Sequence, residues 1–333
     1  MNSNQLSNKK SIISIRNLAI HFPLKRSLPW QTKEYLKAVN DTSFDILEGE
    51  TLGLVGESGC GKSTLLRALI GLNSPASCGN IYYKDYNLAQ LKPFDTTWRR
   101  IRCDIQMIFQ DPFASLNPRM TIGNIIQEPL KVHKPDLSAK QRKQQVEEMM
   151  RLVGLSPNFI NRYPHQFSGG QCQRVGIARA LILKPKILLC DEPVSALDVS
   201  IQAQVVNLLK QLQKELNLTI VFVAHNLSVV KHISDRIVVM YLGKIMEIGQ
   251  AKALCEKPQH PYTKALLSAV PIPDPKLEKN KQVQILEGDL PSPVNPPSGC
   301  VFRTRCPRAS KDCAKITPAL KATQHNLSAC IGI

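Results

Sequence analysis

A glycine-rich turn between an apolar run and a helical pattern constrains this chain more than any other feature. Residues 56–63 read Gly-Glu-Ser-Gly-Cys-Gly-Lys-Ser. They follow a short apolar run at 51–55, which predicts a strand, and precede residues 64–70, whose amphipathic pattern predicts a helix. Strand, loop and helix in this order favour a phosphate-binding loop over a chance glycine-rich turn.

The residue types of this loop suit an anion. Its glycines let backbone N–H groups turn inward without a side-chain clash, and the helix that starts near Lys62 points the positive end of its dipole at the same place. Lys62 is expected to reach the β- and γ-phosphates of ATP, and the Ser63 hydroxyl to ligate Mg²⁺. The predicted nucleotide-binding residues here are Gly56, Glu57, Ser58, Gly59, Cys60, Gly61, Lys62, Ser63 and Thr64.

An apolar run that ends in two carboxylates, residues 187–192, is the second candidate part of the site. Such a run is typical of a buried parallel strand whose carboxyl end reaches the ligand edge of a sheet. Asp191 is expected to hold the Mg²⁺ shell, and Glu192 to act as general base on the attacking water. The alternative is a strand followed by an acidic turn before Pro193, which the phosphate-binding loop disfavours.

Further motifs make the chain resemble the ATP-binding-cassette (ABC) ATPases over nearly its whole length. Residues 167–171, Phe-Ser-Gly-Gly-Gln, resemble the family signature, with Phe where Leu is commoner. Residues 195–198 resemble its D-loop, and His225 follows an apolar strand like its switch histidine, which contacts the γ-phosphate. Gln110 resembles the glutamine that ligates the metal and senses the transport partner. The resemblance thus adds these site residues: Gln110, Ser168, Gly169, Gly170, Gln171, Asp198 and His225.

The resemblance implies an α/β fold with a RecA-like P-loop core, an antiparallel β subdomain and a helical subdomain at 111–170. That subdomain contains a helical pattern from residue 128 onward and, in the family, docks on membrane subunits. Ser168 and the glycine amides beside it would close on the γ-phosphate bound by a second ATPase subunit, in a head-to-tail dimer. Phe22 is favoured as the aromatic residue that stacks on adenine, with Tyr35 as the alternative.

The last third of the chain indicates a branch of the family. Residues 260–271 and 288–300 resemble the C-terminal extension of dipeptide, oligopeptide and nickel importer ATPases. The resemblance therefore implies an ATPase domain at 1–257, an extension at 258–333, and ATP-driven import of peptides. The implied partners are a second, different ATPase, two permease subunits and an extracytoplasmic peptide-binding protein. Import of nickel or another small solute is the alternative.

Four of the ten cysteines crowd into residues 300–330: Cys300, Cys306, Cys313 and Cys330. Four thiolates suit either a [4Fe–4S] cluster or Zn²⁺. The cluster is favoured because no pair has the short spacing typical of structural zinc and because the importer ATPases that the chain resembles carry a cluster on this pattern. Zinc, disulfides and free thiols remain alternatives. Far in sequence from the phosphate-binding loop, this module is expected to serve structure or docking.

Composition bounds the partners. The chain has 43 Lys and Arg and 26 Asp and Glu, which gives a net charge of +17. Such a charge indicates a nucleic acid or an anionic membrane surface as a partner. A nucleic-acid ABC ATPase would carry long coiled coils, inserted zinc modules or two cassettes, and the sequence has none, so no nucleic acid is expected. Besides a transport ATPase and a nucleic-acid ATPase, a regulatory ATPase that senses iron is a third hypothesis for the function. Only the cysteines support it.

Membrane contact is expected to be peripheral. No apolar run approaches the roughly 18 residues that span a bilayer, and residues 1–10 lack the apolar core of a signal peptide. The resemblance therefore implies a protein on the cytoplasmic face of the bacterial inner membrane, held there by its permeases.

Overall fold

The computed structural model describes residues 10–24, 33–73, 77–92, 94–271, 278–281 and 284–332. The chain forms two compact units. Unit one comprises Met1–Glu48, Leu52–Pro93 and His225–Ile333, and unit two comprises Gly49–Thr51 and Phe94–Ala224. The chain therefore passes repeatedly from one unit to the other.

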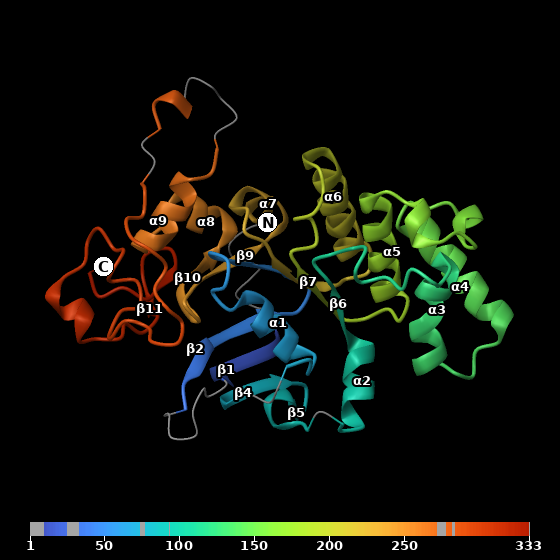
Figure 1. The fold of residues 1–333 in the computed structure, drawn as a ribbon, viewed down its shortest axis with the longest axis horizontal. Helices are drawn as coiled ribbons and strands as arrows, with labels where there is room; N and C mark the ends of the chain where they lie inside the picture. Colours follow the sequence, from blue (N-terminus) through green and yellow to red (C-terminus); the bar gives the residue numbers. More distant parts are fainter. Residues whose placement is uncertain are drawn as a thin grey trace. The chain divides into compact units, whose positions relative to one another are not determined.

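Unit one begins with an antiparallel sheet of strand order β2–β1–β4–β5 (Figure 1). In β1, Ile13 and Ile15 are fully buried while Ser14 between them is partly exposed, as in a strand with one face toward a core. The strands are β1 Ser11–Pro23, β2 Tyr35–Leu47, β4 Cys78–Tyr83 and β5 Tyr86–Asn87.

A second set of strands, which belongs to unit one except for Thr51, carries the glycine-rich loop. β3 runs parallel to β9, and β10 pairs antiparallel with both β9 and β12, which in turn pairs with β11. Every residue of β3 is buried, as expected for a parallel strand covered on both faces. The strands are β3 Thr51–Val55, β9 Arg236–Tyr241, β10 Lys244–Gln250, β11 Lys321–Ala322 and β12 Leu327–Ser328.

Short helices complete unit one. α1 starts at the end of the glycine-rich loop and buries leucines on one face. The helices are α1 Lys62–Leu69, α7 Leu227–Ile233, α8 Ala251–Glu256 and α9 Pro261–Ser268, with 3-10 turns η2 Leu88–Gln90 and η5 Lys311–Ala314.

Unit two contains three parallel strands in the order β6–β7–β8, namely Ile105–Ile108, Ile187–Asp191 and Thr219–Val223. In register, Ile108 pairs with Cys190, and Asp191 pairs with Val223. Because parallel neighbours in register end together, the residues that follow these strands gather at one edge.

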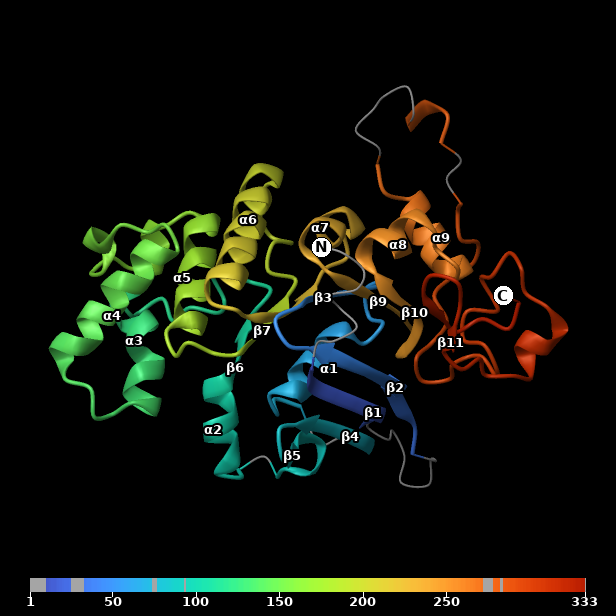
Figure 2. The same ribbon diagram turned by 180° about the vertical axis from the view of Figure 1, so that it is seen from behind.

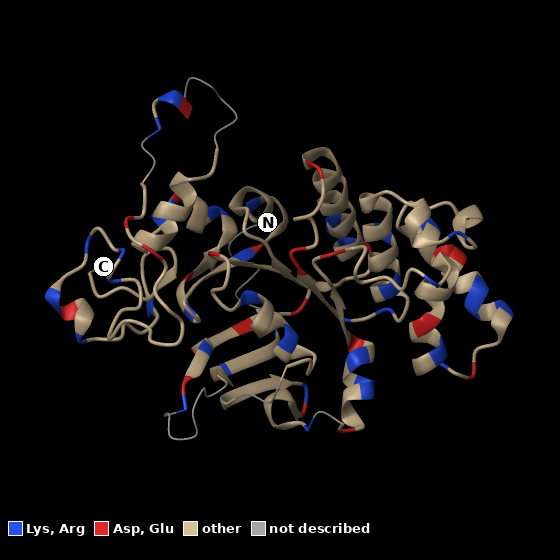
Figure 3. Ribbon diagram, in the orientation of Figure 1, with Lys and Arg blue, Asp and Glu red and all other residues tan. Residues whose placement is uncertain are grey.

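Helices α3, α4 and α5 of this unit lie together in both ribbon views (Figure 2). α4 carries both signs of charge (Figure 3), with Glu147 3.9 Å from Lys143 and 3.8 Å from Arg151. Ion pairs at a protein surface of this kind add little stability. The helices are α2 Thr97–Asp104, α3 Ile122–His133, α4 Ala139–Leu152, α5 Gly169–Leu181 and α6 Val199–Glu215, with turns η3 Pro157–Phe159 and η4 Pro164–Gln166.

Most predicted elements are confirmed. The strand at 51–55 is β3, and the helix from Lys62 is α1. The helical pattern starts earlier than predicted, because α3 begins at Ile122 and includes Pro129. The prolines between residues 271 and 297 predict a linker, and its residues 272–277 and 282–283 lie outside the described residues. Among the residues that are described, no helix is long and apolar enough to cross a membrane.

A buried carboxylate fastens the C-terminal segment to β10. Glu247 has no exposed surface, and its carboxylate accepts hydrogen bonds from the backbone N–H of Gln259 at 2.9 Å and of His260 at 3.0 Å. The side-chain amide of Asn326 donates a third, at 2.9 Å. Buried charge is tolerated when it is hydrogen-bonded in this way, so Glu247 fixes residues 259–260 and Asn326 to β10.

His260 makes the folded state sensitive to acid. Burial lowers the pKa of His260 to about 4, although a hydrogen bond to the backbone of Ala329 opposes the shift. An unfolded histidine titrates near pH 6.5, so unfolding takes up a proton between these values. The contribution of neutral His260 to the free energy of unfolding is therefore full above about pH 6.5. It is lost as the pH falls toward 4, by up to about 1.4 kcal/mol per pH unit.

We therefore predict that the urea midpoint of the protein falls between pH 6.5 and 4. His260→Asn, which keeps an acceptor for the N–H of Tyr262, should flatten this decline, whereas the exposed His165→Asn should not. Equal pH slopes in the wild type and His260→Asn would contradict the prediction.

Candidate active site

The glycine-rich loop of unit one is enclosed by backbone. Gly61 precedes α1 with φ of 104°, and a Cβ at this position would lie 2.0 Å from the carbonyl oxygen of Ala38. The loop is also tied to the β9–β10 turn, because the N–H of Gly243 donates to the carbonyl of Cys60 at 3.0 Å. Only glycine fits position 61, so the sequence motif here reflects a steric requirement.

Lys62 is buried at the start of α1. Its ammonium donates to the carbonyl oxygens of Gly56 at 2.8 Å and Glu57 at 2.9 Å, and lies 3.7 Å from the sulfur of Cys60. An ammonium held in a loop of backbone groups at a helix N-terminus forms a site suited to phosphate. Ser63, the next residue of α1, is partly exposed.

The acidic part of the predicted site lies in unit two, at the carboxyl edge of its strands. Asp191 ends β7 and is 1% exposed. Gln110 follows β6, and its amide donates to a carboxylate oxygen of Glu192 at 3.0 Å. The register of β6 and β7 explains this meeting of residues 82 positions apart.

Glu192 has an unusual backbone. Its φ is 46°, a left-handed conformation that costs a non-glycine residue about 1–2 kcal/mol. Three hydrogen bonds hold it there: its N–H donates to Val223, and its carbonyl accepts from the backbone and the hydroxyl of Ser195. Strained residues that are held so firmly occur preferentially at functional sites.

The signature residues cap α5 in unit two. Ser168 is the N-cap, and its hydroxyl and backbone N–H exchange hydrogen bonds with Gln171. A Cβ on Gly170 would lie 2.5 Å from the side chain of Ile201 in α6, so the signature packs tightly against the start of that helix. Phe167, the departure from the commoner Leu, is buried edge-on against Phe159.

The remaining predicted residues lie on several different elements. Phe22 is partly exposed near the end of β1, and Tyr35 is 40% exposed at the start of β2. Asp198 is the exposed N-cap of α6. His225, which follows β8, is exposed and belongs to unit one. The roles of these residues remain predictions.

The four C-terminal cysteines line one cavity of about 410 Å³. Burial raises the pKa of Cys300, and the charges of the other three thiols add to the shift. Within the described ranges, no three His, Cys, Asp or Glu side chains are close enough together to hold a metal ion.

Two contacts to the glycine-rich loop were not predicted from the sequence. The hydroxyl of Tyr262 accepts the N–H of Glu57 at 2.9 Å, and Arg305 pairs with the Glu57 carboxylate at 2.8 Å. These partners are 205 and 248 residues from Glu57. No local pattern could have revealed them.

Similarity to known proteins decides the family. The chain is 58% identical over 327 residues to the oligopeptide transport ATP-binding protein OppF of Escherichia coli K12, which covers 98% of this chain and 97% of that protein. The chain belongs to the ABC transporter family. This ABC transporter protein is also 61% identical over 322 residues to OppF of Haemophilus influenzae, with 96% of each covered. Residues 39–195 match the family described as ABC transporter, and residues 246–313 match the oligopeptide/dipeptide transporter C-terminal region.

Solved structures of ABC cassettes agree on the fold. The dimeric ATP-binding cassette MJ0796, in a post-hydrolysis state bound to ADP and Pi, gives a TM-score of 0.63 at 29% identity. It covers 72% of this chain and 98% of its own. The cbiO1 protein of Clostridium perfringens has the same TM-score at 24% identity, covers 75% and 92%, and supports the fold alone. The predicted α/β ABC ATPase fold is confirmed.

Gly61→Ala tests the enclosed loop of this ABC transporter protein. The added methyl group meets the carbonyl of Ala38, so the loop must shift, and we expect nucleotide affinity to fall by about a hundredfold. Gly59→Ala is the matched control, since φ there is 78° but no atom lies within 4 Å of the new Cβ. Gly59→Ala should destabilise the folded loop only by the strain of a left-handed alanine, about 1–2 kcal/mol. Equal losses in both variants, measured by titration with ADP, would contradict this explanation.

Proposed function

We propose that this chain is the ATP-hydrolysing subunit of an importer of di- or oligopeptides. Full-length similarity carries the proposal, because relatives at 58% and 61% identity are named oligopeptide transport ATP-binding proteins. The match of residues 246–313 to the oligopeptide/dipeptide transporter C-terminal region supports the same substrate class.

We assign the binding roles from chemistry and position. Lys62, with the N–H groups of the loop, holds the β- and γ-phosphates. Mg²⁺ would supply positive charge to the phosphate oxygens, and Ser63, Gln110 and Asp191 would be the residues that hold it. Phe22 stacks on adenine. This assignment is supported by the buried ammonium of Lys62 and by Asp191 at the carboxyl end of β7.

Glu192 is assigned as the general base. Its backbone is fixed by bonds to Val223 and Ser195, and its carboxylate is oriented by Gln110. A carboxylate fixed in this way accepts a proton from water without first having to be ordered. Because Gln110 also touches this base, a shift of the segment after β6 would change the orientation of the carboxylate, which supports its role as a sensor of the transport partner. His225 contacts the γ-phosphate.

The partner assembly follows from the signature. Ser168 and the amides at the start of α5 form an anion site at a helix N-terminus, which we assign to the γ-phosphate held by a second ATPase subunit of different sequence. The MJ0796 cassette is dimeric in its solved structure, which supports this arrangement. Two permease subunits would hold the ATPase pair at the cytoplasmic face of the inner membrane and receive substrate from a peptide-binding protein. Asp198, beside the signature, would face the partner.

The transported solute has one alternative. The sequence resemblance leaves nickel or another small solute as the alternative, whereas the match of the C-terminal region and the names of the two OppF relatives favour peptides. A nucleic-acid function is not favoured by any feature of the site.

Glu192→Gln tests the catalytic assignment. The amide cannot accept the proton of water, so we expect hydrolysis by the complete transporter to fall by about 10²–10⁴-fold while ATP still binds. The measurement is phosphate release alongside retention of labelled ATP. Glu215→Gln, an exposed carboxylate at the end of α6, should leave both unchanged. Near-normal phosphate release by Glu192→Gln would overturn the assignment.

We further propose that Cys300, Cys306, Cys313 and Cys330 hold a [4Fe–4S] cluster, with Zn²⁺ as the alternative. Their shared cavity supports a four-thiolate site. The charges of the other three thiols raise the pKa of Cys300, and a bound cation would offset that repulsion. The group would stabilise the fold of residues 300–330, which otherwise have only short regular elements.

Metal analysis of anaerobically purified protein tests this proposal. We expect iron and sulfide with broad visible absorption, both lost in Cys313→Ser and retained in Cys78→Ser, an exposed cysteine of β4. Stoichiometric zinc without iron would contradict the cluster and support the alternative, a Zn²⁺ site. Neither metal in the wild-type protein would refute both.

A further inference from the structure

Glu57, the second residue of the phosphate-binding loop, is held at three points. Its N–H donates to the hydroxyl of Tyr262 at 2.9 Å, and its carbonyl accepts from the ammonium of Lys62 at 2.9 Å. Its carboxylate accepts two hydrogen bonds from one guanidinium nitrogen of Arg305, at 2.8 and 3.0 Å. Two of these three partners come from the C-terminal extension, and the third is the lysine assigned to the phosphates.

The two extension residues are themselves firmly placed. Tyr262 in α9 is fully buried, and its ring packs against Tyr241 and Phe302 with centroid distances of 4.8 and 5.3 Å. Burial raises the pKa of Tyr262, so its hydroxyl stays neutral. The side chain of Arg305 is only 11% exposed and interacts with Tyr241. Neither side chain is free to leave Glu57 without disturbing this aromatic cluster.

Arg305 also belongs to the cysteine segment. Its N–H donates to the carbonyl of Phe302 at 3.1 Å, and Cys306 follows it directly. At the other side of this turn, the N–H of Cys300 donates to the carbonyl of Cys313 at 2.8 Å. The position of the guanidinium therefore depends on the fold of the segment that carries the four cysteines.

We propose that Arg305 and Tyr262 are positioning residues for the phosphate-binding loop, so that the fold of the cysteine segment sets nucleotide affinity. The inference rests on the proposed function, since it concerns the same loop. Both residues act on Glu57, on its backbone and on its carboxylate, rather than on the reacting phosphate. Their loss leaves the loop to be ordered by the nucleotide, which weakens ground-state and transition-state binding equally.

The expected signature is a rise in KM at unchanged kcat. A charge-assisted hydrogen bond of low exposure contributes enough to change affinity by about tenfold. By thermodynamic linkage, nucleotide binding must in turn stabilise the cysteine segment. The amides of residues 300–306 should therefore exchange more slowly when ADP is bound.

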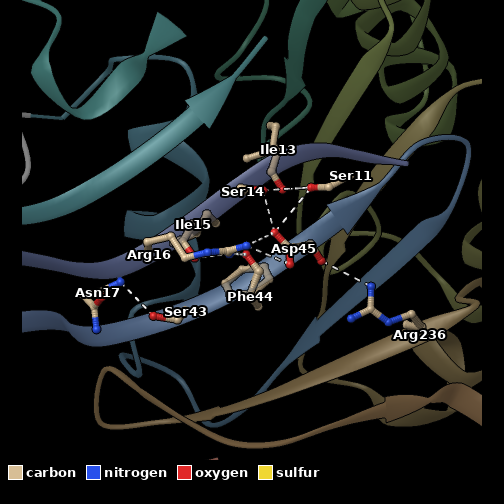
Figure 4. Close-up of polar contacts among 10 residues, drawn as sticks. All are labelled: Ser11, Ile13, Ser14, Ile15, Arg16, Asn17, Ser43, Phe44, Asp45 and Arg236. Atoms are coloured by element: carbon tan, nitrogen blue, oxygen red, sulfur yellow. Dashed lines mark hydrogen bonds and ion pairs between the residues drawn. The ribbon is translucent and has the colours of Figure 1, made fainter. Parts of the chain in front are cut away.

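The chain offers a matched control pair on β1 and β2 (Figure 4). Arg16 donates to both carboxylate oxygens of Asp45, at 2.8 and 3.1 Å, in the same kind of ion pair. The side chains of Arg16 and Asp45 are 45% and 37% exposed, against 11% and 27% for Arg305 and Glu57. Arg16→Met should therefore leave nucleotide affinity unchanged.

The experiment compares Arg305→Met, Tyr262→Phe and Arg16→Met in the full chain. Labelled ADP gives the Kd, the assembled transporter gives KM and kcat, and hydrogen exchange is followed with and without ADP. We expect Kd and KM about tenfold higher in Arg305→Met, and about three- to tenfold higher in Tyr262→Phe, with kcat kept. ADP should protect residues 300–306 in the wild type and not in Arg305→Met, while still protecting α1 at saturation.

Two further variants separate positioning from a general loss of stability. Arg305→Lys, which keeps the charge, should restore part of the affinity. Glu57→Gln combined with Arg305→Met should bind no worse than Arg305→Met alone, because both act through one pair. Should Arg305→Met fail to fold, Tyr262→Phe decides, since it removes a single oxygen and keeps the packing.

A wild-type chain that binds ADP, with Kd unchanged in Tyr262→Phe and in folded Arg305→Met, refutes this inference and leaves the proposed function intact. Loss of kcat at unchanged KM refutes it equally. A wild-type chain that binds no nucleotide refutes the proposed function itself.

Discussion

The phosphate-binding loop depends on the close approach of two stretches of backbone. Position 61 has no room for a side chain because the carbonyl of Ala38, in β2, lies against it. The carbonyl of Cys60 in turn accepts from Gly243 in the β9–β10 turn. The antiparallel sheet on one side and β9 and β10 on the other restrain the backbone of the loop at Cys60 and Gly61. This restraint helps to keep the N–H groups of the loop available for an anion.

Two glutamates connect the core of unit one to the last third of the chain. Glu247 is entirely buried and accepts three N–H donors, so its charge is stabilised by groups that would otherwise lack partners. Glu57 is paired with Arg305 at partial exposure. The first fixes where the extension starts and ends on β10. The second brings the cysteine segment to the glycine-rich loop, so a region that looks like an appendage in sequence contacts this loop directly.

Sequence predicted what is local and missed what depends on distant contacts. The strand, loop and helix around Lys62 were predictable because one short motif specifies all three. The strand before Asp191 was predictable from its apolar run. The pair of Glu57 and Arg305 was not, since nothing in either neighbourhood encodes a contact across 248 residues. The left-handed backbone of Glu192 was equally hidden, because its cause lies in hydrogen bonds to other segments.

The missing side chain of Gly170 has a mechanical consequence. Ile201 is so close to Gly170 that a single methyl group could not be inserted between them. The first turns of α5 and α6 are therefore packed tightly against each other. Neither turn can slide past the other without opening a void. A displacement of Ser168 would therefore move the turn that carries Asp198 as well. Ser168 and Asp198 thus belong to one rigid part of the surface, and a displacement of either residue also displaces the other.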